Sequence, residues 1–252
     1  MSTTTTSTTP SPGLELDEVP RRGARSQLVT TGLAGVAMLA LQFTGQALIS
    51  TEAAEPAFDA PASEIHTFFA ANDPSLMAAG SYLSALSVLA ALFFAGGLAS
   101  LLRRDWRAPL VLACGLGYAL AVGVGWELAA TRVEEGLNPD LARLAFDLGN
   151  LSFATAWVAL GGFTVVTGCA LRTHRLAPAW VAWMGAVAGI CAVAARAVWT
   201  SPFWLVGYSL FLVWTLAICA VLLARAFRAD TSDPDRHHGF EPSGALARRE
   251  ES

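Results

Sequence analysis

Six apolar runs follow one another along the chain and dominate its pattern of hydrophobic and polar positions. They cover residues 28–50, 76–102, 109–130, 148–171, 179–199 and 203–225. A helix of about 20 apolar residues spans the roughly 30 Å of hydrocarbon in a bilayer. The pattern therefore predicts an all-α fold, a polytopic transmembrane bundle of six helices that occupies residues 27–228.

The two ends of the chain lack this pattern. Residues 1–26 begin with a stretch of Ser, Thr and Pro, and residues 229–252 are polar and charged. Segments of such composition bury too little apolar surface to fold alone, so we expect both tails to be disordered. The first apolar run is longer than the core of a secretory signal, and we expect it to be retained as a membrane helix.

A polar segment of unusual charge separates the first two runs. Residues 51–73 hold five carboxylates and no Arg. Within this segment, Ile65, Phe68 and Phe69 recur at helical spacing. The spacing predicts a short amphipathic helix that lies on the membrane surface or caps the bundle.

Two helix starts can be located from capping chemistry. Asp73-Pro74 and Asn138-Pro139 each place a capping side chain directly before a Pro at the first helical position. The fourth membrane helix is therefore predicted to begin near Pro139, two or three turns ahead of its apolar run. Pro178 is predicted to open the fifth helix in a similar way.

Composition agrees with a membrane protein, and the distribution of charge predicts its orientation in the membrane. Hydrophobic residues make up 54% of the chain and charged residues 14%, against about a quarter charged in soluble domains. All 16 basic residues are Arg, and 13 lie in the tails or in the second-to-third and fourth-to-fifth connections. The positive-inside rule then predicts that both termini are cytoplasmic, in a multi-pass protein of a bacterial cytoplasmic membrane.

Polar side chains recur at one depth, near the extracytoplasmic ends of the predicted helices. They are Gln42, Gln46, Glu127, Arg143, Asp147, Asn150, Arg196 and Tyr208. A charge that faces lipid costs at least ~2.5–3.5 kcal/mol at the centre of a helix, so we expect these groups to face the interior. The small-residue face of Gly185 and Gly189 indicates where helices approach closely. We expect Asp147 to pair with Arg196 and to have Arg143 as an i,i+4 neighbour.

Two interpretations of this polar layer remain open. It is either a set of structural ion pairs that fixes the register of the helices, or a small outward-facing pocket. In the second case the loop that carries His66 and Phe68 would close over the pocket. The ligand would be a lipid headgroup, an ion or a small solute.

Sequence motifs give no support to catalysis or cofactor binding. The chain shows no nucleophile with an accompanying base, no phosphate-binding loop and no dinucleotide fingerprint. The four His lie outside the predicted spans, which argues against an intramembrane haem. The four Cys lie inside apolar runs without CxxC spacing and are expected to be packing residues. We therefore predict no enzymatic activity, no cofactor and no metal.

Two sequence stretches are similar to a known group of proteins. "FDLGN" (residues 146–150) precedes a long span, and "LRTHRLAPAWVAWMG" (residues 171–185) forms a basic turn with a Pro-x-Trp helix start. In this the chain resembles a family of bacterial membrane proteins with about six helices, known only as a domain of unknown function. The resemblance implies the topology and implies no chemistry.

These observations lead to an integral membrane protein without a nameable biochemical reaction. The first hypothesis is a small membrane scaffold or sensor that uses its polar layer. The alternative is a proton- or solute-coupled transporter or channel subunit with Glu127 and Asp147 as protonatable groups. The expected partners are the lipid bilayer and either a small ligand or another membrane protein. The net charge of −4 and the dispersed Arg residues argue against nucleic acid.

Overall fold

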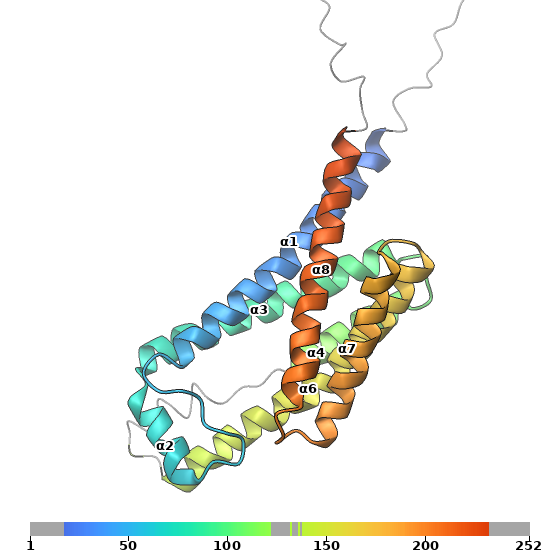
Figure 1. Cartoon of the computed structure of the whole chain (residues 1–252). Coiled ribbons are helices and arrows are strands. Elements are labelled where there is room, and N and C mark those ends of the chain that lie inside the picture. The colour runs from blue at the N-terminus through green and yellow to red at the C-terminus, as the bar shows by residue number, and fades with distance from the viewer. Residues whose placement is uncertain (1–17, 122–131, 133–135, 137, 232–252) are drawn as a thin grey trace, which may run out of the picture.

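Seven helices make up the part of the chain that the computed structural model describes, which is residues 18–121, 132, 136 and 138–231 (Figure 1). They are α1 (Glu18–Ile49), α2 (Ala62–Ala71), α3 (Pro74–Leu101), α4 (Ala108–Ala121), α6 (Pro139–Thr173), α7 (Ala179–Ala197) and α8 (Trp204–Thr231). Five of them contain segments long and apolar enough to cross a membrane, at 23–49, 74–101, 139–173, 179–197 and 204–228. The predicted all-α class and the multi-pass character are therefore confirmed.

The predicted third span, 109–130, is described over its first half. There α4 is an apolar helix of 14 residues, which is shorter than a bilayer crossing needs. Residues 122–130 lie outside the described part of the chain. The structure thus supports five spans, and the sixth stays a prediction.

The long helices extend beyond the predicted limits of the membrane domain. Helix α1 begins at Glu18 and α8 continues to Thr231. Residues 18–26 and 229–231 of the two predicted tails thus belong to helices, and the remainder of both predicted tails lies outside the described residues. The reason is that Glu, Arg and Ala favour helix and that Pro20 falls in the first turn, where a Pro is tolerated.

The predicted capping chemistry is confirmed at two helix starts, and the predicted position is confirmed at a third. The Asp73 side chain accepts a hydrogen bond from the backbone N of Ser75, and Asn138 accepts one from Asp140. Helix α7 starts directly after Pro178. Helix α6, with 35 residues, is about 50 Å long, so it exceeds the thickness of the hydrocarbon.

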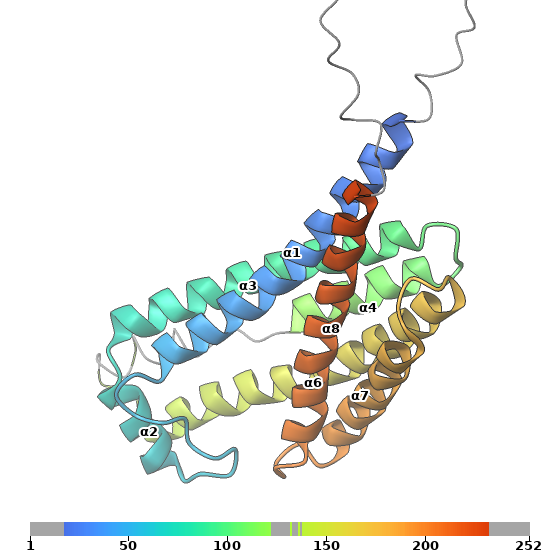
Figure 2. The same cartoon turned by 45° about the horizontal axis from the view of Figure 1, so that its top comes forward.

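The helices are arranged as two closely packed pairs joined by the others. In both views, α1 runs alongside α3 and α6 runs alongside α7, while α8 crosses between the pairs (Figures 1 and 2). Helix α8 packs on α1 and α7, and α4 packs on α3 and α6. Helix α2 lies at one end of the molecule and packs on α6. The start of α1 and the end of α8 lie together at the other end.

A glycine–glycine contact holds each pair together. A Cβ atom on Gly189 of α7 would lie 2.5 Å from the carbonyl oxygen of Gly161 on α6, and a Cβ on Gly80 of α3 would lie 2.5 Å from that of Gly45 on α1. Carbon atoms do not approach oxygen so closely, so both contacts require the absence of a side chain. The predicted close approach at the Gly185 and Gly189 face is confirmed.

An apolar core fills the region where α8 meets the two pairs. Trp214 of α8 is fully buried there, with its ring at right angles to Phe163 of α6 and 5.9 Å from it between centroids. Phe94 of α3 contacts the same Phe163 ring at 6.1 Å. Edge-to-face pairs of this kind fix the relative positions of helices from both pairs.

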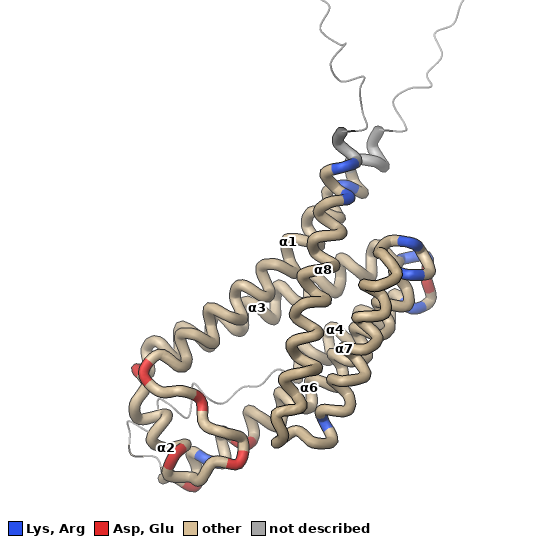
Figure 3. Tube along the Cα trace, viewed as in Figure 1, with Lys and Arg blue, Asp and Glu red and all other residues tan. Residues whose placement is uncertain are grey.

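Charged residues are divided between the two ends of the molecule (Figure 3). Basic residues gather where α1 begins and α8 ends, and in the turns that join α3 to α4 and α6 to α7; this is the basic end. Acidic residues gather around α2 at the opposite end, the cap end. The membrane spans between them carry few charges, as a bilayer requires.

Candidate functional site

The cap end is organised around residues 50–73, which we call the α2 cap. The predicted amphipathic helix is confirmed as α2, with Ile65, Phe68 and Phe69 buried. These side chains form an apolar cluster with Met77 of α3 and Phe146 of α6. The α2 cap therefore covers the bundle instead of lying free on the membrane surface.

A single asparagine holds the chain that leads into α2. The Oδ1 atom of Asn72 accepts hydrogen bonds from the backbone N of Glu52 at 3.0 Å and of Ala53 at 3.2 Å. Its Nδ2 atom donates to the carbonyl oxygen of Phe68 at 2.9 Å and to that of Ala53 at 3.4 Å. Only 2% of Asn72 is exposed. Sequence reasoning missed this residue, because an Asn before Asp73-Pro74 looks like an ordinary turn residue.

The predicted neighbours Arg143 and Asp147 lie under the α2 cap. The Nη1 atom of Arg143 donates to the carbonyl oxygen of Ala60 at 3.1 Å, and its Nε atom lies 3.5 Å from Oδ2 of Asp147. The predicted i,i+4 pair is confirmed. Both side chains are about 40% exposed, so the ion pair itself contributes little to stability. Its role is to orient the guanidinium toward the cap.

The predicted pairing of Asp147 with Arg196 is wrong. The ion pair of Asp147 is with Arg143, on the same helix. Arg196 is half-buried near the end of α7, and no hydrogen bond or ion pair joins it to another described side chain. The shared depth of the two residues stays a prediction; from the contact of Gly161 with Gly189, Asp147 lies 14 residues along α6 and Arg196 lies 7 residues along α7. Their contact depends in addition on the rotation of each helix about its axis, which depth does not determine.

Gln46 and Gln42 take separate roles along α1. The Nε2 atom of Gln46 donates to Oε2 of Glu55 in the α2 cap at 3.0 Å. Gln42, one turn further into the bundle, accepts a hydrogen bond from the Ser87 hydroxyl of α3 at 2.9 Å. Gln46 therefore belongs to the cap, whereas Gln42 joins α1 to α3.

Glu55 is the titratable group that sequence reasoning missed in the α2 cap. The residue keeps solvent-accessible surface, yet protein surrounds enough of its carboxyl to raise its pKa to about 7 by desolvation. An acid with this pKa changes its charge within the physiological range. No signal in the sequence distinguishes Glu55 from the other acids of the segment.

Asn150 of α6 and Tyr208 of α8 are farther along their helices from the α2 cap. Asn150 is 4% exposed, and its Nδ2 atom has no hydrogen-bond partner within the described chain. The Nε1 atom of Trp157, two turns along α6, is also without one. Such buried donors cost about 1–3 kcal/mol each, so an acceptor oxygen beside them would be favourable. Tyr208 contacts the rings of Phe153 and Trp204 at 5.9 and 6.1 Å.

Aromatic contacts also tie the α2 cap to the turn between α7 and α8. The ring of Phe58 lies 5.7 Å from Trp199 and 5.7 Å from Trp204, measured between centroids. Trp204 in turn stacks on Trp157 of α6 at 5.8 Å with 13° between the planes. Through Phe58 the cap thus contacts the turn between α7 and α8 in addition to α1, where it binds Gln46.

The predicted polar layer is therefore divided by the structure. Gln46, Arg143 and Asp147 belong to the surroundings of the α2 cap. Gln42 binds a side chain of α3, while Asn150 and Tyr208 lie among apolar and aromatic residues. Glu127 lies outside the described residues.

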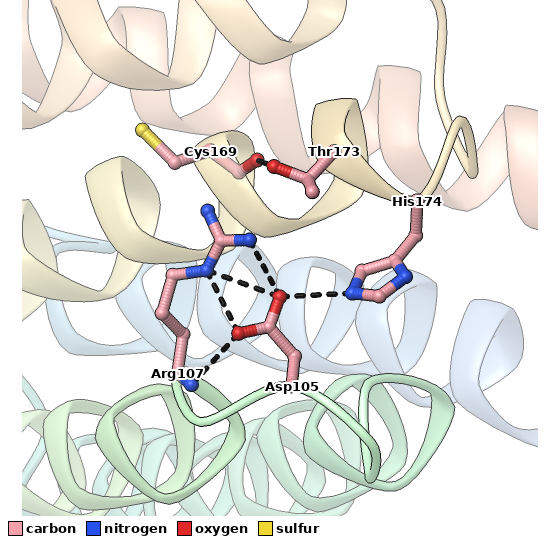
Figure 4. Close-up of polar contacts among 5 residues, drawn as sticks. All are labelled: Asp105, Arg107, Cys169, Thr173 and His174. Atoms are coloured by element: carbon pink, nitrogen blue, oxygen red, sulfur yellow. Dashed lines mark hydrogen bonds and ion pairs between the residues drawn. The ribbon is translucent and has the colours of Figure 1, made fainter.

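A second polar cluster lies at the basic end, where the sequence gave no indication of one (Figure 4). Asp105, in the turn after α3, accepts from Nη2 of Arg107 at 2.6 Å and from its Nε at 2.9 Å. The Nε2 atom of His174, at the end of α6, lies 2.9 Å from Oδ2 of the same carboxylate. The cluster joins two turns that are 69 residues apart in the sequence.

The chemistry of this cluster is that of a structural junction. The Arg107 and His174 side chains cover the Asp105 carboxylate locally, close to the surface of the protein, and its side chain is 3% exposed. Hydrogen bonds from Arg107 hold the pKa of Asp105 well below its usual range, so this carboxylate stays charged at any physiological pH. Among the described residues, no three His, Cys, Asp or Glu side chains lie close enough together to hold a metal.

Comparison of the chain with protein-family models, with curated proteins and with solved structures finds no match. The resemblance of residues 146–150 and 171–185 to a family of bacterial membrane proteins therefore stays a prediction. The function must be argued from the geometry of the chain itself.

Proposed function

We propose that the chain is a small sensor or scaffold of a bacterial cytoplasmic membrane, with six spans, both termini in the cytoplasm and the α2 cap outside. One observation carries the proposal: the cap contacts the cap-end termini of α1, α3 and α6 and the turn that joins α7 to α8. The contacts are made by Gln46, Met77, Arg143, Phe146, Trp199 and Trp204. A ligand or partner that shifts the cap therefore acts on all these helices at once.

The distribution of charge supports the proposed orientation. Within the described residues, the basic end holds Arg103, Arg104, Arg172 and Arg175 in two short turns. Short loops rich in Arg are retained in the cytoplasm during insertion. The acidic α2 cap then lies on the extracytoplasmic side, where an external signal can reach it.

The surface of the α2 cap supports an interaction there. A shallow hollow lies between the incoming chain and α2, and Pro56 and Pro61 form part of its wall. Glu64 and Thr67 supply polar groups, and Phe68 lies at its base. A small polar ligand or a loop of another membrane protein is the kind of partner that fits a shallow, mixed surface.

The transporter alternative finds less support. It depended on Glu127, which lies outside the described residues, and on Asp147. The latter is engaged by Arg143 at a partly exposed position beneath the cap. Within the described chain no observation favours this alternative over the sensor or scaffold.

Thiol labelling tests the proposed topology. In a chain whose four native Cys are replaced, Ala57→Cys should react in intact cells with a thiol reagent that cannot cross membranes, because Ala57 is exposed in the cap. As the matched control, Arg104→Cys at the basic end should react only after lysis. The reverse pattern would contradict the orientation.

Protonation of Glu55 tests whether the α2 cap transmits a signal. Its folded-state pKa is raised from 4.5 to about 7, so the folded cap binds the proton more tightly than the unfolded chain. The contribution of this proton to the stability of the folded cap is fully present below pH 4.5 and is lost as pH rises through 7. Amide protection of residues 51–61, measured by hydrogen exchange and corrected for intrinsic rates, should therefore be higher at pH 5 than at pH 8. The amide protection of the cap-end turns of α1 and α6 should change with pH in the same direction.

Two variants make this expectation specific. Glu55→Gln keeps an oxygen for Gln46 and removes the charge, so protection should stay high at pH 8. Glu64→Gln, on the exposed side of α2, should retain the difference between the two pH values. If pH changed the amide protection of residues 51–61 alone in the unmodified protein, the cap would not transmit a signal to the helices. That result would favour the scaffold over the sensor.

A further inference from the structure

The turn that follows α6 carries an arginine in an unusual backbone conformation. Arg175 has a φ of 52°, and it is the one non-Gly residue of the described chain with positive φ. The backbone N of Leu176 donates to the carbonyl oxygen of Leu171 at 2.8 Å, which closes the turn around it. Glycine is the residue that favours such a position at the end of a helix. An Arg in its place is less favourable for the backbone than Gly would be.

A second arginine is held against this turn. The Nη2 atom of Arg225, on α8, donates to the carbonyl oxygen of Arg175 at 2.7 Å. The guanidinium of Arg225 is therefore held against the backbone of the turn that carries Arg175, 50 residues away in the sequence. Both are exposed, and no ion pair with a carboxylate is formed by either within the described chain.

A third arginine completes the group and is directed by an aromatic ring. The guanidinium carbon of Arg172 lies 5.2 Å from the centroid of the Trp183 ring on α7. The acid of the neighbouring turn, Asp105, is already bound by Arg107 and His174 (Figure 4). Arg172 of α6, Arg175 of the turn after α6 and Arg225 of α8 thus form a group of positive charge, which we call the arginine site.

The surroundings of the arginine site are those of a membrane interface. Trp180 and Trp183, in the first turns of α7, are 59% and 62% exposed. Exposed Trp at the end of a membrane span lies at the level of the lipid headgroups. The three guanidinium groups therefore lie where the phosphates of a bilayer are found.

We propose that the arginine site binds the phosphate-bearing headgroup of an anionic phospholipid. Guanidinium groups bind phosphate oxygens through pairs of charge-assisted hydrogen bonds, and three of them exceed the single negative charge of one phosphodiester. Trp180 and Trp183 pack beside the glycerol region and the start of the acyl chains. Basic groups between membrane helices on the cytoplasmic side have this function in general. The inference goes beyond the proposed function, because it concerns the opposite end of the molecule.

Lipid nanodiscs test the arginine site directly. The complete protein is reconstituted in phosphatidylcholine alone or with added phosphatidylglycerol, and lipid binding is measured by native mass spectrometry together with Tm. The unmodified protein should retain phosphatidylglycerol and show a higher Tm in its presence. The double variant Arg172→Gln/Arg225→Gln should bind it about 30-fold more weakly and lose the rise in Tm.

A matched variant separates a defined site from general surface charge. Arg103→Gln/Arg104→Gln removes the same charge from the neighbouring exposed turn of the basic end. It should keep most of the rise in Tm. Equal losses in the two double variants would overturn the proposal in favour of diffuse attraction. A rise in Tm produced in detergent by millimolar inorganic phosphate alone would overturn the assignment to a lipid.

The variant Arg175→Gly separates a loss of lipid binding from a loss of folding. Glycine suits the positive φ, so this variant should have a higher Tm than the unmodified protein in phosphatidylcholine. Its response to phosphatidylglycerol should nevertheless be smaller. A variant that gains stability and keeps the full lipid response would show that Arg175 takes no part in binding.

Discussion

Replacing Gly189 with Leu should separate α6 from α7 and lower the free energy of unfolding by about 3 kcal/mol, the upper range for overpacking. The new Cβ atom would lie 2.5 Å from the carbonyl oxygen of Gly161 and 2.5 Å from Oγ1 of Thr164. A backbone carbonyl within a helix cannot move aside as the end of a side chain can. Thermal unfolding in detergent, followed by circular dichroism, measures the effect.

Gly96→Ala is the matched control for this substitution. Gly96 also lies within a membrane helix, α3, but nothing lies within 4 Å of a Cβ atom placed on it. Alanine is the better helix former, so the control should be neutral or gain up to about 1 kcal/mol. If Gly189→Leu were as stable as this control, the contact between α6 and α7 would be refuted.

Substitution of Asn72 with Ala should release the chain that leads into α2 and lower the free energy of unfolding by about 3 kcal/mol. The change leaves the backbone N–H groups of Glu52 and Ala53 without their acceptor, and each such loss costs about 1–3 kcal/mol. Tm in detergent should fall. Protease cleavage within residues 51–61 should become faster, since these residues lose their attachment.

Asn138→Ala provides the comparison for Asn72. Asn138 is exposed and caps the first turn of α6 through one hydrogen bond to Asp140, so its loss should cost about 1 kcal/mol. Cleavage of residues 51–61 should not change in this variant. Equal losses of stability from the two substitutions would show that Asn72 serves merely as a local turn residue.

The features that could be predicted from the sequence are those set by neighbours along the chain. The spacing of Ile65, Phe68 and Phe69 predicted α2, because residues three and four apart share a face of a helix. Asn138-Pro139 predicted the start of α6 ahead of its apolar run. The pair of Arg143 with Asp147 is of the same kind, since an i,i+4 contact lies on one helix.

Contacts between distant segments could not be predicted in this way. Asn72 binds Glu52 because the chain returns over 20 residues, and Asp105 meets His174 across 69. Such contacts depend on how far each helix is rotated and where each turn ends. Asp147 and Arg196 illustrate this limit: counting residues from the helix ends does not give the register in which α6 packs on α7, nor the direction of each side chain.

The length of α6 has a mechanical consequence. Its contact with α7 at Gly161 lies well off-centre, with 22 residues toward Pro139 and 12 toward Thr173. At 1.5 Å per residue the two arms measure about 33 and 18 Å. A tilt of about 5° around this fulcrum would displace the long arm by about 3 Å and the short arm by about half as much, in opposite directions. If α6 tilted as a rigid body around this contact, a shift at its long arm would become a smaller, reversed shift at its short arm.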